Sequence, residues 1–390
     1  MATYDLRRFS TPEGLKAIAP DHLLKFLREF EQFFVARGVT LPGPQDADQL
    51  DYAGIVDVLM KPGADTPEEL KDALFTIHEM STEEGAEVLI DELAASSRAQ
   101  QVAPNSTPAD IAMQAYLFDK RLLQQKHAEQ NMVRQRSFEY YQSNKQTPPA
   151  FTKPTAGKRK NLESDLDDWF ESKKRDRVSK VLFYERGGEV WFLVRHGDLY
   201  KREGSIKDGK SESIYYRPEK YDVLVYNTQL GELRIHAASK GEKDLYRAKF
   251  GLHLFGDENL FSGEDKYTLK PLQDDGPKSI VCDDVNGMEW VKLTEIQYYW
   301  GGPHNDVEIR RSDDMFLSLA AKERVIPPSA RILRATFKVR FTDSKKERAV
   351  RIRPSNVAHY VRDTDGVIVE DFLAKRGFIK GAVASEGEED

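Results

Sequence analysis

The chain has 390 residues, enough for about two domains. Apolar residues make up 39% and charged residues 32%, and no apolar run approaches the ~18 residues of a membrane span, so a soluble protein is expected. The net charge of −7 argues against wholesale wrapping of nucleic acid, and the single Cys282 excludes an internal disulfide or a cysteine-rich zinc site. The first residues lack the apolar segment of a signal peptide, which predicts a cytoplasmic location.

Residues 1–142 are predicted to form an acidic, all-helical domain. In residues 21–38, leucine and phenylalanine recur at three- and four-residue spacings, which predicts an amphipathic helix. Residues 66–69 and 81–84 both fit the capping box that starts a helix. The starts differ in spacing, so no helical repeat is predicted.

A long helix is predicted from Pro108 to about Tyr141. Pro108 suits a first helical turn, and the first half carries apolar residues at helical spacing. The second half is polar. A polar helix of this length is either a strut between domains or a surface for a partner, so homo-oligomerisation through residues 108–141 is a second interpretation.

Residues 143–162 are predicted to be a basic linker. Three prolines and a glycine disfavour regular structure there. Lys158, Arg159 and Lys160 form a short basic run that would suit contact with phosphates, although a solvated linker explains the same run. The linker separates the acidic domain from a nearly neutral one.

Residues 163–380 are predicted to form a β-rich α+β domain. Residues 180–196 contain two β-rich runs around Arg186, Gly187 and Gly188, which is a hairpin pattern. Further strands are predicted at 213–217, 221–226, 232–237, 288–300, 332–341 and 348–353, with a helix at 242–255. The predicted fold class is therefore α+β, with an N-terminal all-α lobe and a C-terminal antiparallel lobe capped by helices. An acidic, disordered tail is expected at 381–390.

The end of the second domain carries two helix-like segments, 355–361 and 365–375, after a predicted hairpin. This order is compatible with a winged-helix-like unit that binds DNA. Glu370 and Asp371 within the second segment oppose contact with phosphates and favour a packing role. The basic residues that would serve nucleic-acid binding here are Arg351, Arg353, Arg362, Lys375 and Arg376.

Two neighbouring predicted strands carry the best candidates for catalysis. A metal-dependent nuclease needs carboxylates that converge with a cation, and Asp222, Glu232 and Arg234 come nearest to that pattern. The match is imperfect, because Glu232 begins its strand and arginine replaces lysine. Charged residues on a solvated strand face explain the same pattern.

The same region alternates tyrosines with basic residues, among them Arg217, a mixture that would suit nucleic acid on a sheet face as well as a protein interface or a core. The common phosphate-binding and hydrolase motifs are missing from the sequence.

We therefore expect a non-catalytic recognition protein: a sensor, adaptor or regulatory subunit, by fold-level analogy one of a prokaryotic multi-gene system such as antiviral defence. The expected partner is a protein, with nucleic acid as a second candidate and no membrane. No metal or cofactor is expected. A metal-dependent nuclease and a DNA-binding protein that uses the C-terminal unit are the alternatives.

Overall fold

The structure is a computed structural model that describes residues 6–63, 65–95, 102, 105–133, 135–207 and 209–380. It divides into two compact units, residues 1–131 and 132–390. The first contains helices and the second a large antiparallel sheet with its own helices, so the predicted α+β class is confirmed. The predicted tail at 381–390 lies outside the described residues.

The first unit is built from short helices around one apolar core. Its longest members include α5 (Glu68–Met80) and α6 (Glu83–Ala95), and α7 is buried along most of its length. The predicted helix at 21–38 is divided at Phe30 into α2 and α3. The remaining bounds are α1 (Pro12–Lys16), α2 (Pro20–Arg28), α3 (Glu31–Ala36), α4 (Tyr52–Leu59), α7 (Pro108–Phe118) and α8 (Lys120–Val133).

The continuous helix predicted at 108–141 is wrong. Asp119 interrupts it, because its carboxylate accepts hydrogen bonds from the backbone N–H groups of Arg121 and Leu122 and so starts α8. Residues Ser137–Gln142 form strand β1, in which Phe138 and Tyr140 lie on one face and Tyr141 on the other. The long polar helix on which the oligomerisation hypothesis was based is therefore not present.

The segment predicted as a linker also contains regular structure. Helix α9 (Ala156–Ser172) begins inside it, after Thr155 accepts a hydrogen bond from the backbone N–H of Lys158. Along the chain, the boundary between the two compact units falls between residues 131 and 132, ahead of the predicted boundary at 142, because β1 pairs within the sheet of the second unit.

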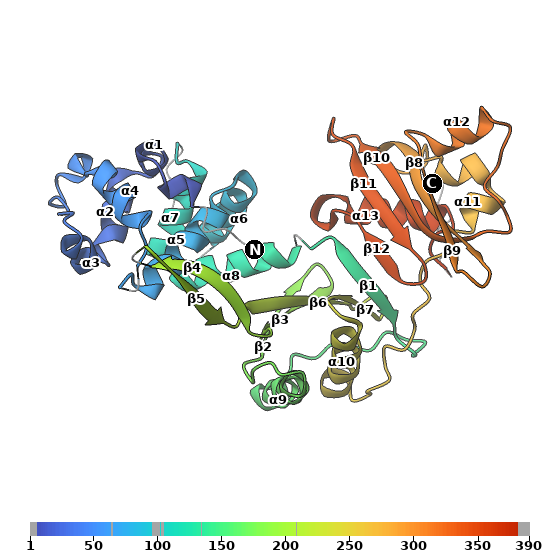
Figure 1. The fold of residues 1–390 in the computed structure, drawn as a ribbon, viewed down its shortest axis with the longest axis horizontal. Helices are drawn as coiled ribbons and strands as arrows, with labels where there is room; N and C mark the ends of the chain where they lie inside the picture. The colour runs from blue at the N-terminus through green and yellow to red at the C-terminus, as the bar shows by residue number, and fades with distance from the viewer. Residues whose placement is uncertain are drawn as a thin grey trace. The chain divides into compact units, whose positions relative to one another are not determined.

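The second unit holds a ten-stranded sheet in which every neighbouring pair is antiparallel, in the order β2-β3-β6-β7-β1-β12-β11-β10-β8-β9 (Figure 1). Strands β4 (Lys201–Lys207) and β5 (Lys210–Tyr216) form a separate hairpin. The sheet strands are β1, β2 (Lys180–Arg186), β3 (Glu189–Gly197), β6 (Glu219–Asn227), β7 (Glu232–His236), β8 (Met288–Gly301), β9 (Asp306–Arg311), β10 (Arg331–Phe341), β11 (Arg348–Arg353) and β12 (Val357–His359).

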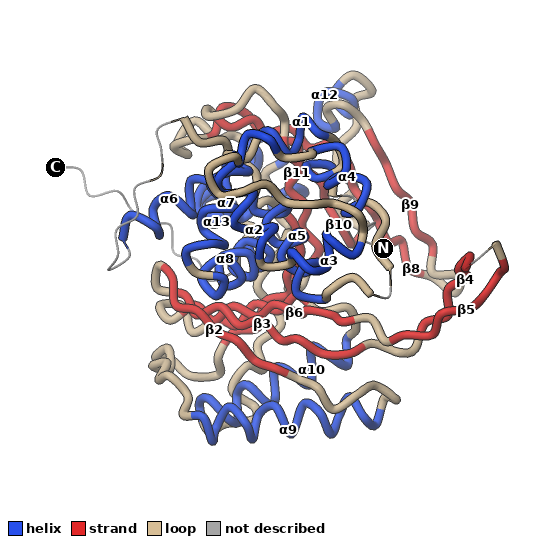
Figure 2. Tube along the Cα trace, turned by 90° about the vertical axis from the view of Figure 1, so that its left-hand side faces the viewer, coloured by secondary structure: helices blue, strands red, loops and turns tan. Residues whose placement is uncertain are grey.

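Helices cover each sheet face over a different set of strands. Helices α9 and α10 (Lys240–Phe250) lie on one side of β2, β3 and β6, as Figure 2 shows, and form an apolar core with them. We call this side the α10 face. Helix α13 (Arg362–Lys375) packs on the opposite side, the α13 face, where Phe372 contacts Phe337 of β10. Two short helices, α11 (Pro271–Asp274) and α12 (Met315–Ala320), complete the unit.

The helix predicted at 355–361 is also wrong. Residues Val357–His359 form β12, which pairs with β1 and β11, so the described C-terminal segment holds one helix after a strand. A helix-turn-helix arrangement is therefore not formed there. Among the described residues, no helix combines the length and apolar character that a membrane span needs.

Candidate functional site

The sheet separates the residues proposed for a nuclease. Neighbouring residues of a strand point to opposite faces, and cross-strand partners share one. Asp222 pairs with Val194 on the α10 face, whereas Glu232 pairs with Asn227 and Arg234 with Val225 on the α13 face. The side-chain contacts agree, since Asp222 meets Tyr246 of α10 and Glu232 meets Lys266. Asp222 and Glu232 therefore do not belong to one site.

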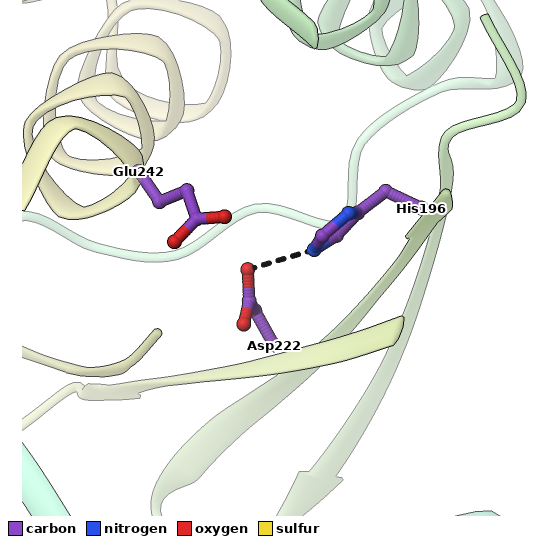
Figure 3. A group of neighbouring side chains, drawn as sticks. All are labelled: His196, Asp222 and Glu242. Atoms are coloured by element: carbon purple, nitrogen blue, oxygen red, sulfur yellow. Dashed lines mark hydrogen bonds and ion pairs between the residues drawn. The ribbon is translucent and has the colours of Figure 1, made fainter. Parts of the chain in front are cut away.

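On the α10 face, Asp222 belongs to a buried polar cluster with His196 and Glu242. Figure 3 shows the three side chains directed toward a common point, with the imidazole beside the Asp222 carboxylate. Their potential ligand atoms all lie within 4.8 Å of one another, the one such group of three among the described residues. His, Asp and Glu are ordinary ligands for a divalent cation.

Each carboxylate of this cluster is already matched by donors of the chain. Asp222 lies 3.0 Å from His196 Nε2 and accepts a hydrogen bond of 2.7 Å from the Tyr246 hydroxyl. Glu242 accepts a hydrogen bond from Arg175 at 2.6 Å and closes the capping box of α10 with Ser239. Burial opposes ionisation of Glu242, but Arg175 and Ser239 outweigh it and hold its pKa below the usual value. Both carboxylates of this cluster are therefore satisfied by donors of the chain, as in a structural network.

On the α13 face, Glu232 belongs to a second buried cluster. Lys266 Nζ lies 3.0 Å from one Glu232 oxygen and 3.4 Å from Glu370, and it sits 4.0 Å from the centre of the Tyr140 ring. Glu370 also accepts a hydrogen bond of 2.7 Å from Tyr360. Lys266 has no local signal in the sequence, because its partners lie 34 and 104 residues away.

The pKa values of the two carboxyl groups of this cluster are shifted in opposite directions. Burial raises the pKa of Glu232 above its ordinary value, and the nearby Lys266 only partly offsets this. Burial also opposes ionisation of Glu370, but Lys266 and Arg234 outweigh it and lower its pKa to about 2. At neutral pH Glu370 is thus ionised and provides the negative charge that pairs with Lys266.

The α10 face continues onto strands that α9 and α10 do not reach, and there it is basic. Arg353 is paired with Val357, Val357 with Glu139, and Glu139 with Ile235, so these strands share one continuous face. We call this surface the basic face. Its cations are exposed or partly exposed and come from β8, β10 and β11: Lys292, Arg334, Lys338, Arg340, Arg351 and Arg353.

A shallow pocket of about 270 Å³ lies on the basic face, next to α10. Arg334, Arg351 and Arg353 line it together with His359. Burial lowers the pKa of His359 most, and the positive charge of Arg351 lowers it further. Glu139 is the one carboxylate among its lining residues, and it lies 2.6 Å from Lys243.

The other basic residues predicted to bind nucleic acid differ in their exposure and contacts. Lys158, Arg159 and Lys160 are exposed in the first turns of α9. Arg217 is engaged within the chain, 3.0 Å from Asp176 and stacked 4.1 Å over Tyr200.

At the end of α13, two basic residues bind Asp284. Lys375 donates to the backbone carbonyl of Asp284, and Arg376 donates to its side-chain carboxylate. Arg362 lies on the α13 face, stacked 3.9 Å over Tyr360. The structure thus brings together only Arg351 and Arg353 of the residues predicted to bind nucleic acid in the C-terminal segment.

Comparison of the sequence with protein-family models and with curated proteins finds no match.

Proposed function

We propose that this chain is a non-catalytic recognition protein, a sensor, adaptor or regulatory subunit, that binds nucleic acid through the basic face. The observation that carries the proposal is a set of cations without a carboxylate partner. Lys292, Arg340 and Arg351 form no ion pair with any described residue, although the chain as a whole has a net charge of −7. Cations left unpaired on an acidic protein are suited to an external polyanion.

The remaining charges of this face support the same interpretation. Glu295 is shared between Arg311 at 2.5 Å and Arg334 at 2.8 Å. Lys338 is paired with Glu347 at 3.0 Å, and Arg353 lies 3.8 Å from Glu139. The cations of the basic face still outnumber these three carboxylates, so the surface is net positive. Trp290 is partly exposed and lies beneath Lys292 and Arg340, whose cations are 5.0 Å and 5.5 Å from its ring. An aromatic ring among cations on an open sheet is typical of surfaces that bind single strands.

Recognition without a reaction agrees with the two polar clusters. Their carboxylates are held by donors of the chain itself, and Asp222 lies on the opposite face from Glu232. We therefore do not propose a hydrolase that uses Asp222 and Glu232. We also do not propose DNA binding by a C-terminal helix-turn-helix, because residues Val357–His359 form a strand.

Fluorescence anisotropy with a labelled oligonucleotide of about 20 nucleotides, single-stranded or duplex, tests the proposal. Replacement of Arg351 and Arg353 by glutamine should weaken binding by about tenfold or more and reduce the slope of log affinity against log salt by about two, because two phosphate contacts are lost. Both side chains are exposed, so the fold should tolerate the change.

The matched control replaces Lys158, Arg159 and Lys160 by glutamine. This removes more charge from another exposed basic cluster and should leave the affinity nearly unchanged. A larger loss in this control than in the Arg351 and Arg353 variant would contradict the assignment. So would the absence of any binding at about 50 mM salt, where electrostatic contacts are strong.

A further inference from the structure

A pocket of about 500 Å³ opens on the α13 face, away from the basic face. Residues from β3, β6 and β7 line one side, and α13 with the residues just before it lines the other. The volume falls in the usual range for small-molecule sites, about 300–1,000 Å³. Its polar lining includes Glu189, Arg234, Arg362 and Glu370.

Arg234 brings a buried guanidinium group to this pocket. It is 9% exposed, and β7 directs it to the same face as Tyr140, with which it is paired. One terminal nitrogen contacts Glu189, whereas Nε has no hydrogen-bond partner among the described residues. A buried donor without an acceptor costs about 1–3 kcal/mol, and more when it is charged.

Arg362 brings a second guanidinium group with spare donors. Its Cζ lies 3.9 Å from the centre of the Tyr360 ring, and one terminal nitrogen donates to the carbonyl of Ala358 at 3.2 Å. Its Nε and its other terminal nitrogen are buried and have no partner among the described residues. Two arginines with unused donors therefore line one pocket.

The carboxylates of the pocket do not use these donors. Glu232 is paired with Lys266, and Glu370 is bound by Tyr360 and Lys266. Glu189 occupies a single terminal nitrogen of Arg234. Arg186 at the rim adds a further positive charge. These donors therefore have no acceptor among the described residues and are available to a ligand that enters the pocket.

We propose that this pocket binds a small molecule through an oxyanion, a carboxylate or a phosphate, held by Arg234 and Arg362. Guanidinium groups bind both oxyanions through paired hydrogen bonds. Trp191, Leu230 and Val367 also line the pocket and give the rest of the ligand an apolar wall. The ligand class is a compact organic anion with an apolar or aromatic body.

This site does not depend on the proposed binding of nucleic acid, because it lies on the other face of the sheet. A sensor function would couple the two, but each is tested separately. A saturating oligonucleotide on the basic face should not displace a ligand from the pocket.

Calorimetric titration of the full chain with phenyl phosphate, benzoate and inorganic phosphate tests the site. We expect saturable binding with one ligand per chain, and phenyl phosphate should bind about tenfold more tightly than inorganic phosphate, because its ring contacts the apolar wall. Comparison of phenyl phosphate with benzoate identifies which oxyanion the pocket prefers.

Arg362→Gln should weaken binding of the preferred probe by about tenfold or more, because hydrogen bonds to a charged acceptor are lost. Arg351→Gln removes the same charge from the basic face and should leave probe affinity unchanged. Arg362→Lys keeps the charge but not the planar donors, and should give an intermediate loss. Each variant is first checked for cooperative thermal unfolding.

The tryptophan at the pocket wall provides a second measurement that does not require an arginine variant. Trp191 is 9% exposed, and a ligand at the pocket should change its fluorescence. Trp191→Phe should abolish that change while the protein still binds the probe. Equal affinities of the wild type and Arg362→Gln, or no heat and no fluorescence change at about 10 mM probe, would overturn the proposal.

Discussion

At the scale of single residues, Lys266 decides the stability of the α13-face cluster. It is 5% exposed and compensates both Glu232 and Glu370. Lys266→Met should lower the free energy of unfolding by about 3–5 kcal/mol at neutral pH, because it removes the cation from the buried Glu232 and the partly buried Glu370. Urea denaturation measures this loss.

Lys380→Met is the matched control for this substitution. Lys380 lies 2.5 Å from Asp265, but both side chains of that pair are largely in contact with solvent. A surface ion pair contributes about 0–1 kcal/mol, so the control should be close to wild type. Similar losses in the two variants would show that Lys266 is not the buried counterion described here.

Glu370 gives the cluster a defined response to acid. Its pKa is lowered to about 2 from a reference value of 4.5, so its ionised form stabilises the folded state at neutral pH. That contribution is lost as the pH falls from about 4.5 through about 2. The midpoint temperature of thermal unfolding, measured over this interval, should therefore fall more steeply with falling pH in the wild type than in Glu370→Gln. Parallel curves would be inconsistent with a lowered pKa.

At the scale of elements, the start of α10 depends on its capping box. The Ser239 hydroxyl accepts from the backbone N–H of Glu242 at 3.2 Å, and the Glu242 carboxylate accepts from the backbone N–H of Ser239 at 2.6 Å. Ser239→Ala should reduce the free energy of unfolding by about 1 kcal/mol, as measured by chemical denaturation.

Asparagine also caps helices well, so Ser239→Asn should recover most of that stability. If Ser239→Asn is as unstable as Ser239→Ala, the hydroxyl has a role other than capping.

Several elements were predictable because their signals are local. The hairpin of β2 and β3 turns at Gly187 and Gly188, whose positive φ angles of 59° and 79° are those that glycine permits without strain. The helix predicted at 355–361 was wrong, because so short a segment has too few residues to show a reliable hydrophobic period. Their pairing with β1, more than 200 residues earlier in the chain, makes them a strand.

At the scale of the whole molecule, each of the two compact units has a buried core of its own. Both proposed sites consist of residues from the second unit. We therefore expect a fragment of residues 132–390 to unfold cooperatively and to bind the oligonucleotide with the affinity and salt dependence of the full chain. Circular dichroism and anisotropy measure the two properties.

Loss of binding by a fragment that still unfolds cooperatively would show that the first unit contributes directly to the nucleic-acid interface. Full binding would locate the interface within the second unit, as proposed.

By itself, the sequence determined the class of the fold and most strands of the sheet. These depend on patterns that repeat within a few neighbouring residues. Only the tertiary structure decided which charges meet. The register of the strands places Asp222 and Glu232 on opposite faces, because side-chain direction follows from register and not from separation along the chain. The packing of α13 on the sheet brings Glu370 to Lys266.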